Sequence, residues 1–530
     1  MAVRQSLRRR APGDNDDDPK AAVPVAERVA PGRPGMQRPA VMHVHLIAVA
    51  GTGMGALAGL FKELGHDVSG SDVSFDPPMG PALQAWGIRL MKGFDPEHLE
   101  PKPDLVVVGN VCRRDNPEAR AAIDGGVAYT DIGHAMGDLV LKNTSPLVVA
   151  GTHGKTTTTS MCTWLLDQTG FAPGFLVGGL PKNFPHSFRV AAARGPRLPV
   201  ADSAGFAPPA RRVPFVVEGD EYDTAFFEKT PKFWHYRPEV AILTSIEHDH
   251  VDIYPSFDKY LDAFAGMVSR IPEHGLIVAS AADRHVVDIV SRHARCEVAW
   301  YALQGDDTNG QAVHWLGAIA PGDDGMQAFD LYAGGVMSGR FGLRMAGAYN
   351  VRNAVAAIAA TAQGFGASIE RIKEALPRFQ GVRRRQDLLG EPQGIRVYDD
   401  FAHHPTAVDE TLRGLKALHP QGRLIAVFEP RSATACRSMH QQQYARAFGA
   451  ADQVLLAPLG RTTVPEGERL NLVQLVEDLK RGGGQAHAAA SIDEILARLV
   501  HDARPGDTIA LLSNGAFGGI HKRLLEALSA

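Results

Sequence analysis

The sequence has little cysteine, and its cysteines lie far apart. The chain contains four, Cys112, Cys162, Cys296 and Cys436, and no two of them form a Cys-x-x-Cys pair. A structural zinc site or a disulfide framework requires clustered cysteines. We therefore expect neither, and the composition fits a protein of the reducing cytoplasm.

Long apolar runs and an excess of basic charge are absent as well. No apolar run approaches the roughly 18 residues that a membrane-spanning helix needs, and no apolar segment of a secretory signal follows the basic residues 1–10. The formal net charge is −4, whereas general nucleic-acid and membrane-surface binders carry a basic excess. We expect a cytoplasmic, soluble protein with neither nucleic acid nor membrane as a partner. The sequence carries no signal for an oligomeric state.

At 530 residues the chain is too long for one hydrophobic core. Beyond residue 41, apolar strand-like runs alternate with helical runs, which predicts an α/β protein. We expect a disordered tail at 1–40, rich in Arg, Pro, Ala and Asp, and a surface loop at 182–212. Three α/β domains should follow the tail, with predicted bounds of 41–143, 144–380 and 381–530.

The most informative segment is a glycine-rich turn between a strand at 147–150 and a helical run. Such a turn directs backbone N–H groups and the helix N-terminus at a phosphate, while Lys155 adds positive charge and the Thr156 hydroxyl reaches a magnesium ion. Gly151 lies three residues before Gly154 instead of five, so this loop is a shortened variant. An ordinary turn that opens a helix is the alternative. The residues expected at a nucleoside triphosphate are Gly151, Thr152, His153, Gly154, Lys155, Thr156 and Thr157.

A second glycine-rich turn lies near the start of the expected fold. The strand at 44–50 is followed by Gly-Thr-Gly-Met-Gly, a helix, and a second strand that ends in an acidic residue. This order is much like a dinucleotide-binding β-α-β unit, although Ala56 stands where its last glycine belongs. Tight packing of the turn is the alternative. The candidate ligand residues here are Gly51, Thr52, Gly53, Met54, Gly55, Ser71 and Asp72.

Acidic clusters follow two further strands. Glu218 comes directly after the strand at 215–217, and Glu-His-Asp-His at 247–250 follows the strand at 240–244. The carboxyl ends of parallel strands share one sheet edge, so both clusters should lie beside the phosphate loop and hold magnesium; solvated loop acids are the alternative. A later turn at 399–404 joins Asp-Asp to His-His. Adjacent histidines on a turn do not easily point at one ion, so we favour turn packing or substrate contact there.

Taken in order, these motifs resemble those of the Mur ligases, ATP-dependent enzymes that form amide bonds on the UDP-linked precursor of the bacterial cell wall. The resemblance spans residues 43–530 and rests on the early glycine-rich turn, Gly-Thr-His-Gly-Lys-Thr-Thr, Glu-Gly-Asp-Glu, Asp-His at 249–250, Gly-Ala-Tyr-Asn-Val-Arg-Asn-Ala at 347–354, 381–385, and Asp-Asp-Phe-Ala-His-His-Pro. It implies the three-domain Mur ligase architecture. In that architecture a Rossmann-like N-terminal domain, a central P-loop ATPase domain and a Rossmann-like C-terminal domain follow one another.

The resemblance also implies a reaction that uses ATP and Mg²⁺ as cofactors. A carboxylate attacks the γ-phosphate to give an acyl phosphate and ADP, and a peptide amine then displaces phosphate. The implied catalytic residues are Lys155, Glu218, His250 and Arg384. The implied metal ligands are Thr156, Glu218 and His250. The implied nucleotide contacts beyond the loop are Asn350, Asn353, Arg384 and Asp400. The first glycine-rich turn would hold UDP.

Two segments favour one branch of the family. Residues 221–229 and 513–521 resemble the branch that joins a recycled L-Ala-γ-D-Glu-meso-diaminopimelate tripeptide to UDP-N-acetylmuramate. The branch that adds L-alanine to UDP-N-acetylmuramate is the alternative. The expected partners are therefore UDP-N-acetylmuramate and the murein tripeptide, whose carboxylates call for arginine and backbone donors. The candidate peptide-binding residues are Arg431, Asn514 and His521.

Two interpretations from other classes compete with a ligase. An NAD-dependent dehydrogenase could be built on the first glycine-rich turn, but it leaves the loop at 151–157 and both acidic clusters unexplained. A non-catalytic nucleotide switch would bind ATP and a partner protein without producing ADP. NADH turnover without ATP would favour the first of these, and tight ATP binding without ADP formation the second.

Overall fold

Three sheets, one after another along the chain, organise this protein. The computed structural model describes residues 41–192, 211–322, 326–461 and 463–530. The predicted tail at 1–40 and most of the predicted loop at 182–212 lie outside the described residues. We call the parts built on the three sheets the N-terminal, central and C-terminal units. None of the helices in the described ranges has the length and apolar character to cross a membrane.

The N-terminal unit is a five-stranded parallel sheet in the order β3-β2-β1-β4-β5. Its strands are β1 (His43–Ile47), β2 (Asp67–Asp72), β3 (Arg89–Lys92), β4 (Leu105–Val108) and β5 (Tyr129–Asp131). Its helices are α2 (Thr52–Glu63), α3 (Met79–Ala85), α4 (Pro117–Asp124) and α5 (Ile132–Ala135). Strand β1 ends before the predicted residue 50, because the chain turns at Ala48, whose φ is +64°. The turn delivers the N-terminus of α2 to the carboxyl edge of the sheet.

The central unit is a ten-stranded mixed sheet in the order β17-β16-β15-β14-β13-β12-β6-β9-β7-β8. Its strands are β6 (Ser145–Ala150), β7 (Gly174–Leu176), β8 (Phe188–Arg189), β9 (Pro214–Glu218), β12 (Val240–Leu243), β13 (Leu276–Ser280), β14 (Glu297–Leu303), β15 (Trp315–Ala320), β16 (Gln327–Ala333) and β17 (Val336–Leu343). A hairpin of β10 (Asp223–Ala225) and β11 (Glu228–Pro231) lies outside the sheet. The strands from β15 to β7 pair in parallel, as predicted for an α/β unit, whereas β16 and β17 at one edge and β8 at the other pair in antiparallel fashion.

Both faces of the central sheet are covered by helices, α6 (Lys155–Gln168), α7 (Phe257–Val268), α8 (Arg284–His293), α9 (Ala348–Phe365) and α10 (Ile369–Ala375). Successive residues of β6 enter different cores. Leu147 and Val149 belong to the core that contains α6 and α9, while Val148 and Ala150 belong to the core that contains α7 and α8. Burial on both faces explains why β6 reads as a continuous apolar run.

The C-terminal unit is a six-stranded sheet in the order β18-β19-β23-β20-β21-β22, parallel except at the edge strand β18. Its strands are β18 (Asp387–Gly390), β19 (Arg396–Asp400), β20 (Leu424–Phe428), β21 (Gln453–Leu456), β22 (Gln485–Ala488) and β23 (Thr508–Leu512). Its helices are α11 (Pro405–Leu418), α12 (Gln441–Ala447), α13 (Leu472–Arg481), α14 (Ile492–Asp502) and α15 (Ile520–Ser529). The predicted α/β class is therefore confirmed in all three units.

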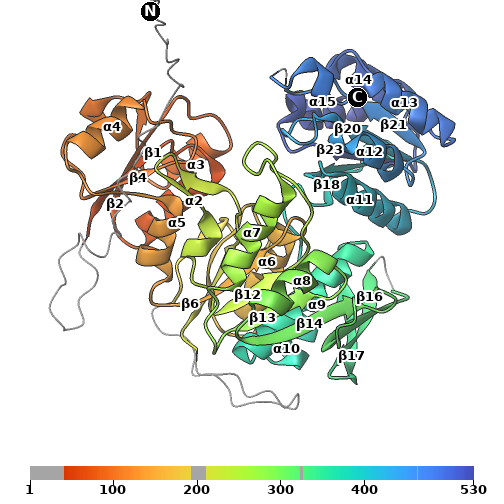
Figure 1. Ribbon diagram of the computed structural model, residues 1–530. Helices are drawn as coiled ribbons and strands as arrows, with labels where there is room; N and C mark the ends of the chain where they lie inside the picture. The colour runs from red at the N-terminus through yellow and green to blue at the C-terminus, as the bar shows by residue number, and fades with distance from the viewer. Residues whose placement is uncertain (1–40, 193–210, 323–325, 462) are drawn as a thin grey trace, which may run out of the picture.

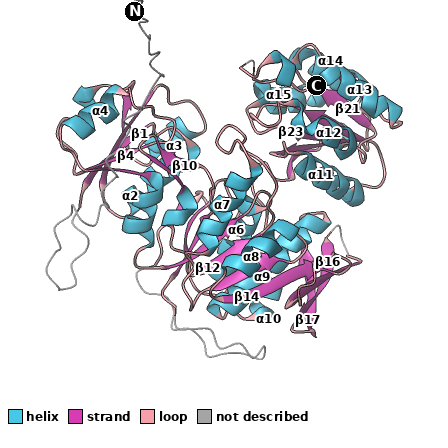
Figure 2. Cartoon of the chain, viewed as in Figure 1, coloured by secondary structure: helices cyan, strands magenta, loops and turns pink. Residues whose placement is uncertain are grey.

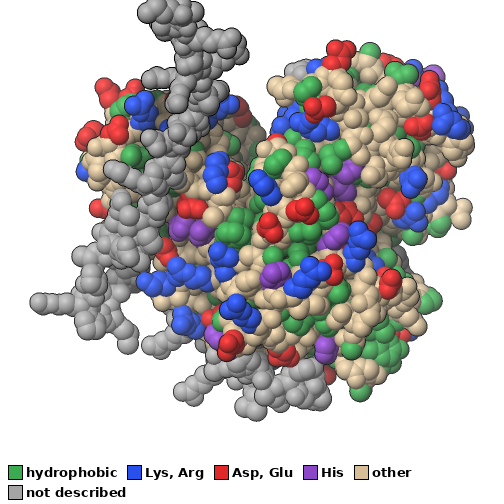
Figure 3. All heavy atoms as spheres, in the orientation of Figure 1, with side chains coloured by type: hydrophobic (Ala, Val, Ile, Leu, Met, Phe, Trp, Pro, Cys, Tyr) green, Lys and Arg blue, Asp and Glu red, His purple; other side chains and the backbone are tan. Residues whose placement is uncertain are grey.

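The three units form three lobes (Figure 1), each a sheet with helices on its faces (Figure 2). The N-terminal unit packs on the central unit through α2, where a side chain at Gly59 would collide with the Phe188 ring of β8. The C-terminal unit lies on the other side of the central unit. In Figure 3, histidine side chains are visible where this upper-right lobe meets the middle of the molecule.

Candidate active site

A cavity of about 690 Å³ lies where the three units meet. The N-terminal unit contributes Gly53 and Ile132, the central unit contributes the phosphate loop, and the C-terminal unit contributes His403 and Arg431. The cavity is therefore bounded by the carboxyl edges of three separate sheets, which is where α/β proteins bind ligands.

The phosphate loop has the conformation that its glycines predict. Strand β6 ends at Ala150 and α6 begins at Lys155. Gly151 and Gly154 have φ values of +136° and +78°, a region that residues with a Cβ rarely adopt. A Cβ on Gly154 would also lie 2.5 Å from the Asn353 side-chain oxygen. The loop thus presents the N-terminus of α6 to the cavity, which suits an anion.

Lys155 is held over its own loop by a buried carboxylate. Its Nζ donates to the carbonyl of Gly151 at 2.5 Å and to Glu221 at 3.2 Å. Burial raises the pKa of Glu221, but the charge of Lys155 and a hydrogen bond from His250 outweigh it and lower that pKa to about 2. Glu221 is thus an ionised partner for a charged lysine. Glu221 is the last residue of the Glu-Gly-Asp-Glu motif, and no contact with Lys155 was predicted for it.

Thr156 and Glu218 meet at the start of α6, as the prediction requires. The Thr156 hydroxyl donates to Glu218 Oε1 at 2.9 Å, and the Gly178 N–H donates to Glu218 Oε2 at 2.8 Å. Burial raises the pKa of Glu218, and Lys155 offsets this only in part. Two oxygen ligands and a carboxylate that lacks full charge compensation fit Mg²⁺, which prefers such ligands.

His250 has both ring nitrogens engaged within the central unit. Its Nε2 lies 3.1 Å from Glu221 Oε1, and its Nδ1 lies 2.8 Å from the Tyr222 hydroxyl. Burial lowers the pKa of His250, but the hydrogen bond and charge of Glu221 raise it overall. In this arrangement the imidazole orients Glu221. Its predicted part as a metal ligand stays a prediction.

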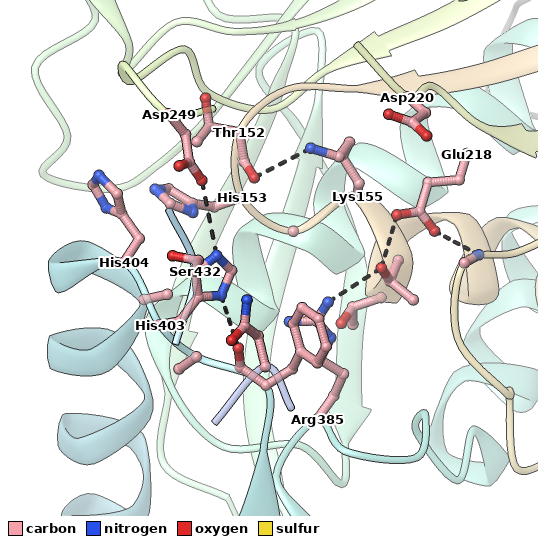
Figure 4. A pocket seen from close by; sticks show the side chains of 18 of the residues that line it. Thr152, His153, Lys155, Glu218, Asp220, Asp249, Arg385, His403, His404 and Ser432 are labelled. Atoms are coloured by element: carbon pink, nitrogen blue, oxygen red, sulfur yellow. Dashed lines mark hydrogen bonds and ion pairs between the residues drawn. The ribbon is translucent and has the colours of Figure 1, made fainter. Parts of the chain in front are cut away.

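The structure brings Arg385 to the cavity rather than its predicted neighbour Arg384. Arg385 Nη2 donates to the Thr156 hydroxyl at 3.3 Å (Figure 4). Arg384 Nη2 instead donates to the backbone carbonyls of Ser513 and Gly515, at 2.5 and 2.8 Å. Arg384 has a φ of +62°, so the backbone reverses there and the two side chains diverge. A run of three consecutive arginines, 383–385, gives no signal for this divergence.

The predicted nucleotide residues of α9 and β19 line the cavity. Asn350 and Asn353 are buried on α9, and Asn350 Nδ2 donates to the carbonyl of Ala346 at 2.8 Å. Asp400 accepts from the N–H groups of Gln386 and Ala402, and burial raises its pKa. These side chains flank the phosphate loop from two different units.

The first glycine-rich turn reaches the cavity at Gly53. Asp72 accepts from the N–H of Ala50 at 2.8 Å and so fastens the turn to β2. Ser71 is fully buried and bonded to Glu118, facing away from the cavity. Gly55 has no room for a side chain because Met79 of α3 packs against it. The predicted UDP residues are thus divided between a cavity wall and the packing behind it.

Of the three predicted peptide residues, Arg431 and Asn514 line the cavity. His521 lies behind it, with Nε2 3.2 Å from Asp399. Arg461 also lines the cavity, although its sequence motif did not predict it. The signal was present, because Arg461 follows β21 as Arg431 follows β20, and these parallel strands are neighbours.

The chain resembles known proteins over most of its length. Three family models match it: the Mur ligase family catalytic domain over 43–144, the Mur ligase middle domain over 149–361, and the Mur ligase glutamate ligase domain over 384–515. Over 489 residues it is 37% identical to the UDP-N-acetylmuramate–L-alanyl-gamma-D-glutamyl-meso-2,6-diaminoheptandioate ligase of Escherichia coli (strain K12), which covers 92% of this chain and 98% of that protein.

Two further matches bear on the two branches. The UDP-N-acetylmuramate–L-alanine ligase of Roseiflexus sp. (strain RS-1) is 33% identical over 504 residues, covering 92% of this chain and 99% of that protein. A crystal structure of a murein peptide ligase from Psychrobacter arcticus 273-4 superposes with a TM-score of 0.66 at 35% identity, covering 92% of this chain and 99% of that chain.

Proposed function

The chain belongs to the Mur ligase family, and on that basis we propose that it joins an L-alanyl-γ-D-glutamyl-meso-diaminopimelate tripeptide to UDP-N-acetylmuramate. It is an ATP-dependent, ADP-forming ligase, as the members of this family are. The proposal is carried by one cavity in which the turn at Gly53, the phosphate loop and Arg431 come together. The relatives support it, since the E. coli tripeptide ligase matches at 37% and the L-alanine ligase at 33%.

The chemistry needs ATP because a carboxylate has no leaving group that an amine can displace at neutral pH. We propose that the muramate carboxylate attacks the γ-phosphate, which gives an acyl phosphate and ADP. The tripeptide α-amine then attacks the acyl carbon, and phosphate leaves. In such a reaction the protein contributes mainly by positioning the groups and neutralising their charge.

The phosphate loop and its surroundings would hold the triphosphate. We assign Gly151 to Gly154 and Lys155 to the phosphates, Thr156 and Glu218 to the magnesium ion, and His250 to the vicinity of the acyl phosphate. When bound, the ion would withdraw charge from the phosphate oxygens. Lys155 is already ionised and only its bonds to Gly151 and Glu221 must be exchanged for phosphate.

The remaining nucleotide contacts would come from α9 and the C-terminal unit. We assign Asn350 and Asn353 to the nucleotide, Asp400 to the ribose hydroxyls, and Arg385 to the phosphates. Arg384 would act beside it by holding the backbone of Ser513 and Gly515, which fixes the segment that carries Asn514. Because ATP is the phosphoryl donor, we place the reaction in the cytoplasm.

The two other substrates would enter from opposite units. The turn from Gly51 to Gly55, fastened by Asp72, would hold UDP, and Arg431 with Asn514 would receive the carboxylates of the tripeptide. This places the muramate carboxylate and the peptide amine on either side of the phosphate loop. His521 would contribute through Asp399 and Arg384 rather than by touching the peptide.

The proposal is tested by phosphate release with purified protein, ATP, Mg²⁺ and UDP-N-acetylmuramate, comparing the tripeptide with L-alanine. Release with the tripeptide alone supports the proposal. Release with L-alanine alone would move the chain to the L-alanine branch, and the interpretation of residues 513–521 would be wrong.

A further inference from the structure

Histidines from two units meet at the edge of the ATP cavity, beside the phosphate loop. His153 belongs to the loop, Glu247 follows β12, and His404 precedes α11. His153 Nε2 lies 2.9 Å from Glu247 Oε2, and His404 Nδ1 lies 3.3 Å from the same oxygen. One ligand atom from each of the three residues lies within 4.8 Å of the other two. In Figure 4 the His153 ring points out of the loop on the side where His404 lies.

His404 is not explained by the hydrogen bonds of the described residues. The residue is 7% exposed, and neither of its ring nitrogens has a hydrogen-bond partner among them. A buried polar group without a partner costs about 1–3 kcal/mol. The ring also faces a carboxylate and a second imidazole. A metal ion bound between these groups would give a His404 nitrogen the partner that it lacks.

The pKa values of two of the three residues are shifted from their ordinary values. Burial lowers the pKa of His404, so its ring is neutral at neutral pH and has a lone pair to give. Burial raises the pKa of Glu247, but a hydrogen bond from His153 and the charge of that ring lower it to about 2. The cluster therefore offers a neutral His404 imidazole and an ionised Glu247 carboxylate beside the His153 ring.

We propose that His153, Glu247 and His404 bind a divalent transition metal of the zinc class. Two imidazoles and one carboxylate form a common three-residue zinc ligand set that leaves one position open. In a tetrahedral zinc site, ligand atoms about 2.0–2.1 Å from the ion are about 3.3 Å from one another, close to the His404–Glu247 separation. His440 stands next to His404 with a ring-centroid distance of 4.8 Å, and its nitrogens also lack described partners.

This site differs in chemistry from the magnesium site at Thr156 and Glu218. That pair offers only oxygen atoms, which suit Mg²⁺, whereas imidazole nitrogens select zinc and its neighbours among the transition metals. The two sites also use different parts of the loop: Thr156 lies in the first turn of α6, whereas the His153 ring precedes the helix and contacts Glu247 and His404.

The position of the site gives binding a structural consequence. Glu247 and His153 belong to the central unit and His404 to the C-terminal unit, and the Thr406 hydroxyl already donates to Glu247 at 2.8 Å. An ion held by all three residues would tie the two units together across the edge of the ATP cavity. Binding to the folded chain alone would then raise its melting temperature.

The test is a titration of the purified full chain with Zn²⁺ in the presence of excess Mg²⁺, followed by the same titration with Co²⁺. We expect one saturable Zn²⁺ per chain, a rise in melting temperature, and the visible absorption of four-coordinate Co²⁺. His404→Gln and Glu247→Gln should each weaken Zn²⁺ binding by about 100-fold, because loss of a ligand costs at least as much as loss of a supporting residue.

His419→Gln is the matched control, because this histidine lies just past the other end of α11 and its ring is bonded to Tyr398. It should bind Zn²⁺ like the unaltered chain. The melting temperatures of all variants without metal report whether they are folded. No Zn²⁺ binding in excess Mg²⁺, or equal binding by the unaltered chain and by both folded ligand variants, would overturn the proposal.

Discussion

At the scale of single residues, two buried carboxylates in one cavity have opposite electrostatic situations. Glu221 is paired with Lys155 and His250, and its pKa is lowered. Glu218 has a raised pKa, because burial outweighs its partners. Glu221 therefore stabilises the fold, whereas a bound cation would stabilise the ionised form of Glu218.

This contrast gives a paired prediction. Glu221→Gln removes the charged partner of the partly buried Lys155 ammonium and leaves it with backbone carbonyls, so we expect a loss of about 1.5–3 kcal/mol in the free energy of unfolding. Glu218→Gln removes a charge that is costly to bury, so stability should be kept while ATP turnover falls. Thermal and urea unfolding of both variants check this. Equal destabilisation by the two would contradict the assigned pairing.

The His250–Glu221 pair predicts a pH dependence. The pKa of His250 is raised above 6.5, so its contribution to stability is full below pH 6.5 and is lost as the pH rises through the raised pKa. The pKa of Glu221 is lowered from 4.5 to about 2. Its contribution to stability is therefore full above pH 4.5 and is lost as the pH falls toward about 2. We expect the melting temperatures of the unaltered chain and His250→Gln to differ most between pH 4.5 and 6.5 and to converge at higher pH. A constant difference would exclude this pairing.

The arginine side chains also show what the sequence could not supply. The motif placed an arginine at the nucleotide, but only the left-handed backbone at Arg384 determines that Arg385 faces Thr156. Likewise, Glu221 meets Lys155 because the loops that follow the paired strands β6 and β9 contact each other. The two residues are 66 positions apart in the sequence. Residue types and spacing carry no information on such side-chain directions.

At the scale of elements, the strand, loop and helix around Lys155 could be predicted from the sequence. The apolar run marks the strand, the glycines mark the turn, and the helical run begins directly after them. The edge strands β16 and β17 were not predicted, since their partly exposed residues, interrupted by polar side chains, lack the continuous apolar run that marked β6. Strand ends were also imprecise. Strand β1 stops at Ile47 because of the turn at Ala48, which no residue type announces.

The phosphate loop supplies a prediction at this scale. Gly154→Ala puts a Cβ into a left-handed backbone and within 2.5 Å of the Asn353 oxygen. We expect a loss of at least about 1–2 kcal/mol in stability and weaker ATP binding, because the Asn353 amide must move away from the loop. Isothermal titration with ATP measures the second effect.

Gly467→Ala is the matched control, since a Cβ there meets no atom within 4 Å and the residue is exposed. It should retain both stability and ATP affinity. ATP affinity of Gly154→Ala equal to that of this control would contradict the account of the loop.

At the scale of the whole molecule, the three-domain Mur ligase architecture predicted from the ordered motifs is confirmed by the family matches and the superposed structure. The motifs sufficed because each marks the carboxyl edge of a different sheet. The motifs do not show how the carboxyl edges of the three sheets are oriented toward one another. The joint cavity, with Arg461 in it, depends on the packing of whole units.

We therefore expect substitutions in the C-terminal unit to change the KM of the tripeptide without changing the KM of ATP. Arg431→Ala and Arg461→Ala should each raise the tripeptide KM by about tenfold or more, since hydrogen bonds to charged groups contribute about 1.5–3 kcal/mol. The ATP KM should change little, because the phosphate loop belongs to another unit. Arg437→Ala, whose guanidinium pairs with Glu468 away from the cavity, is the control. Equal loss for all substrates would contradict a peptide role for these arginines.

The most direct test of the central claim is a competition in one tube. The protein is incubated with ATP, Mg²⁺, UDP-N-acetylmuramate and equal amounts of L-alanine and the L-Ala-γ-D-Glu-meso-diaminopimelate tripeptide. The mass of the UDP-linked product is then determined by mass spectrometry. We expect the tripeptide adduct as the dominant product. A product that carries only L-alanine would contradict that claim.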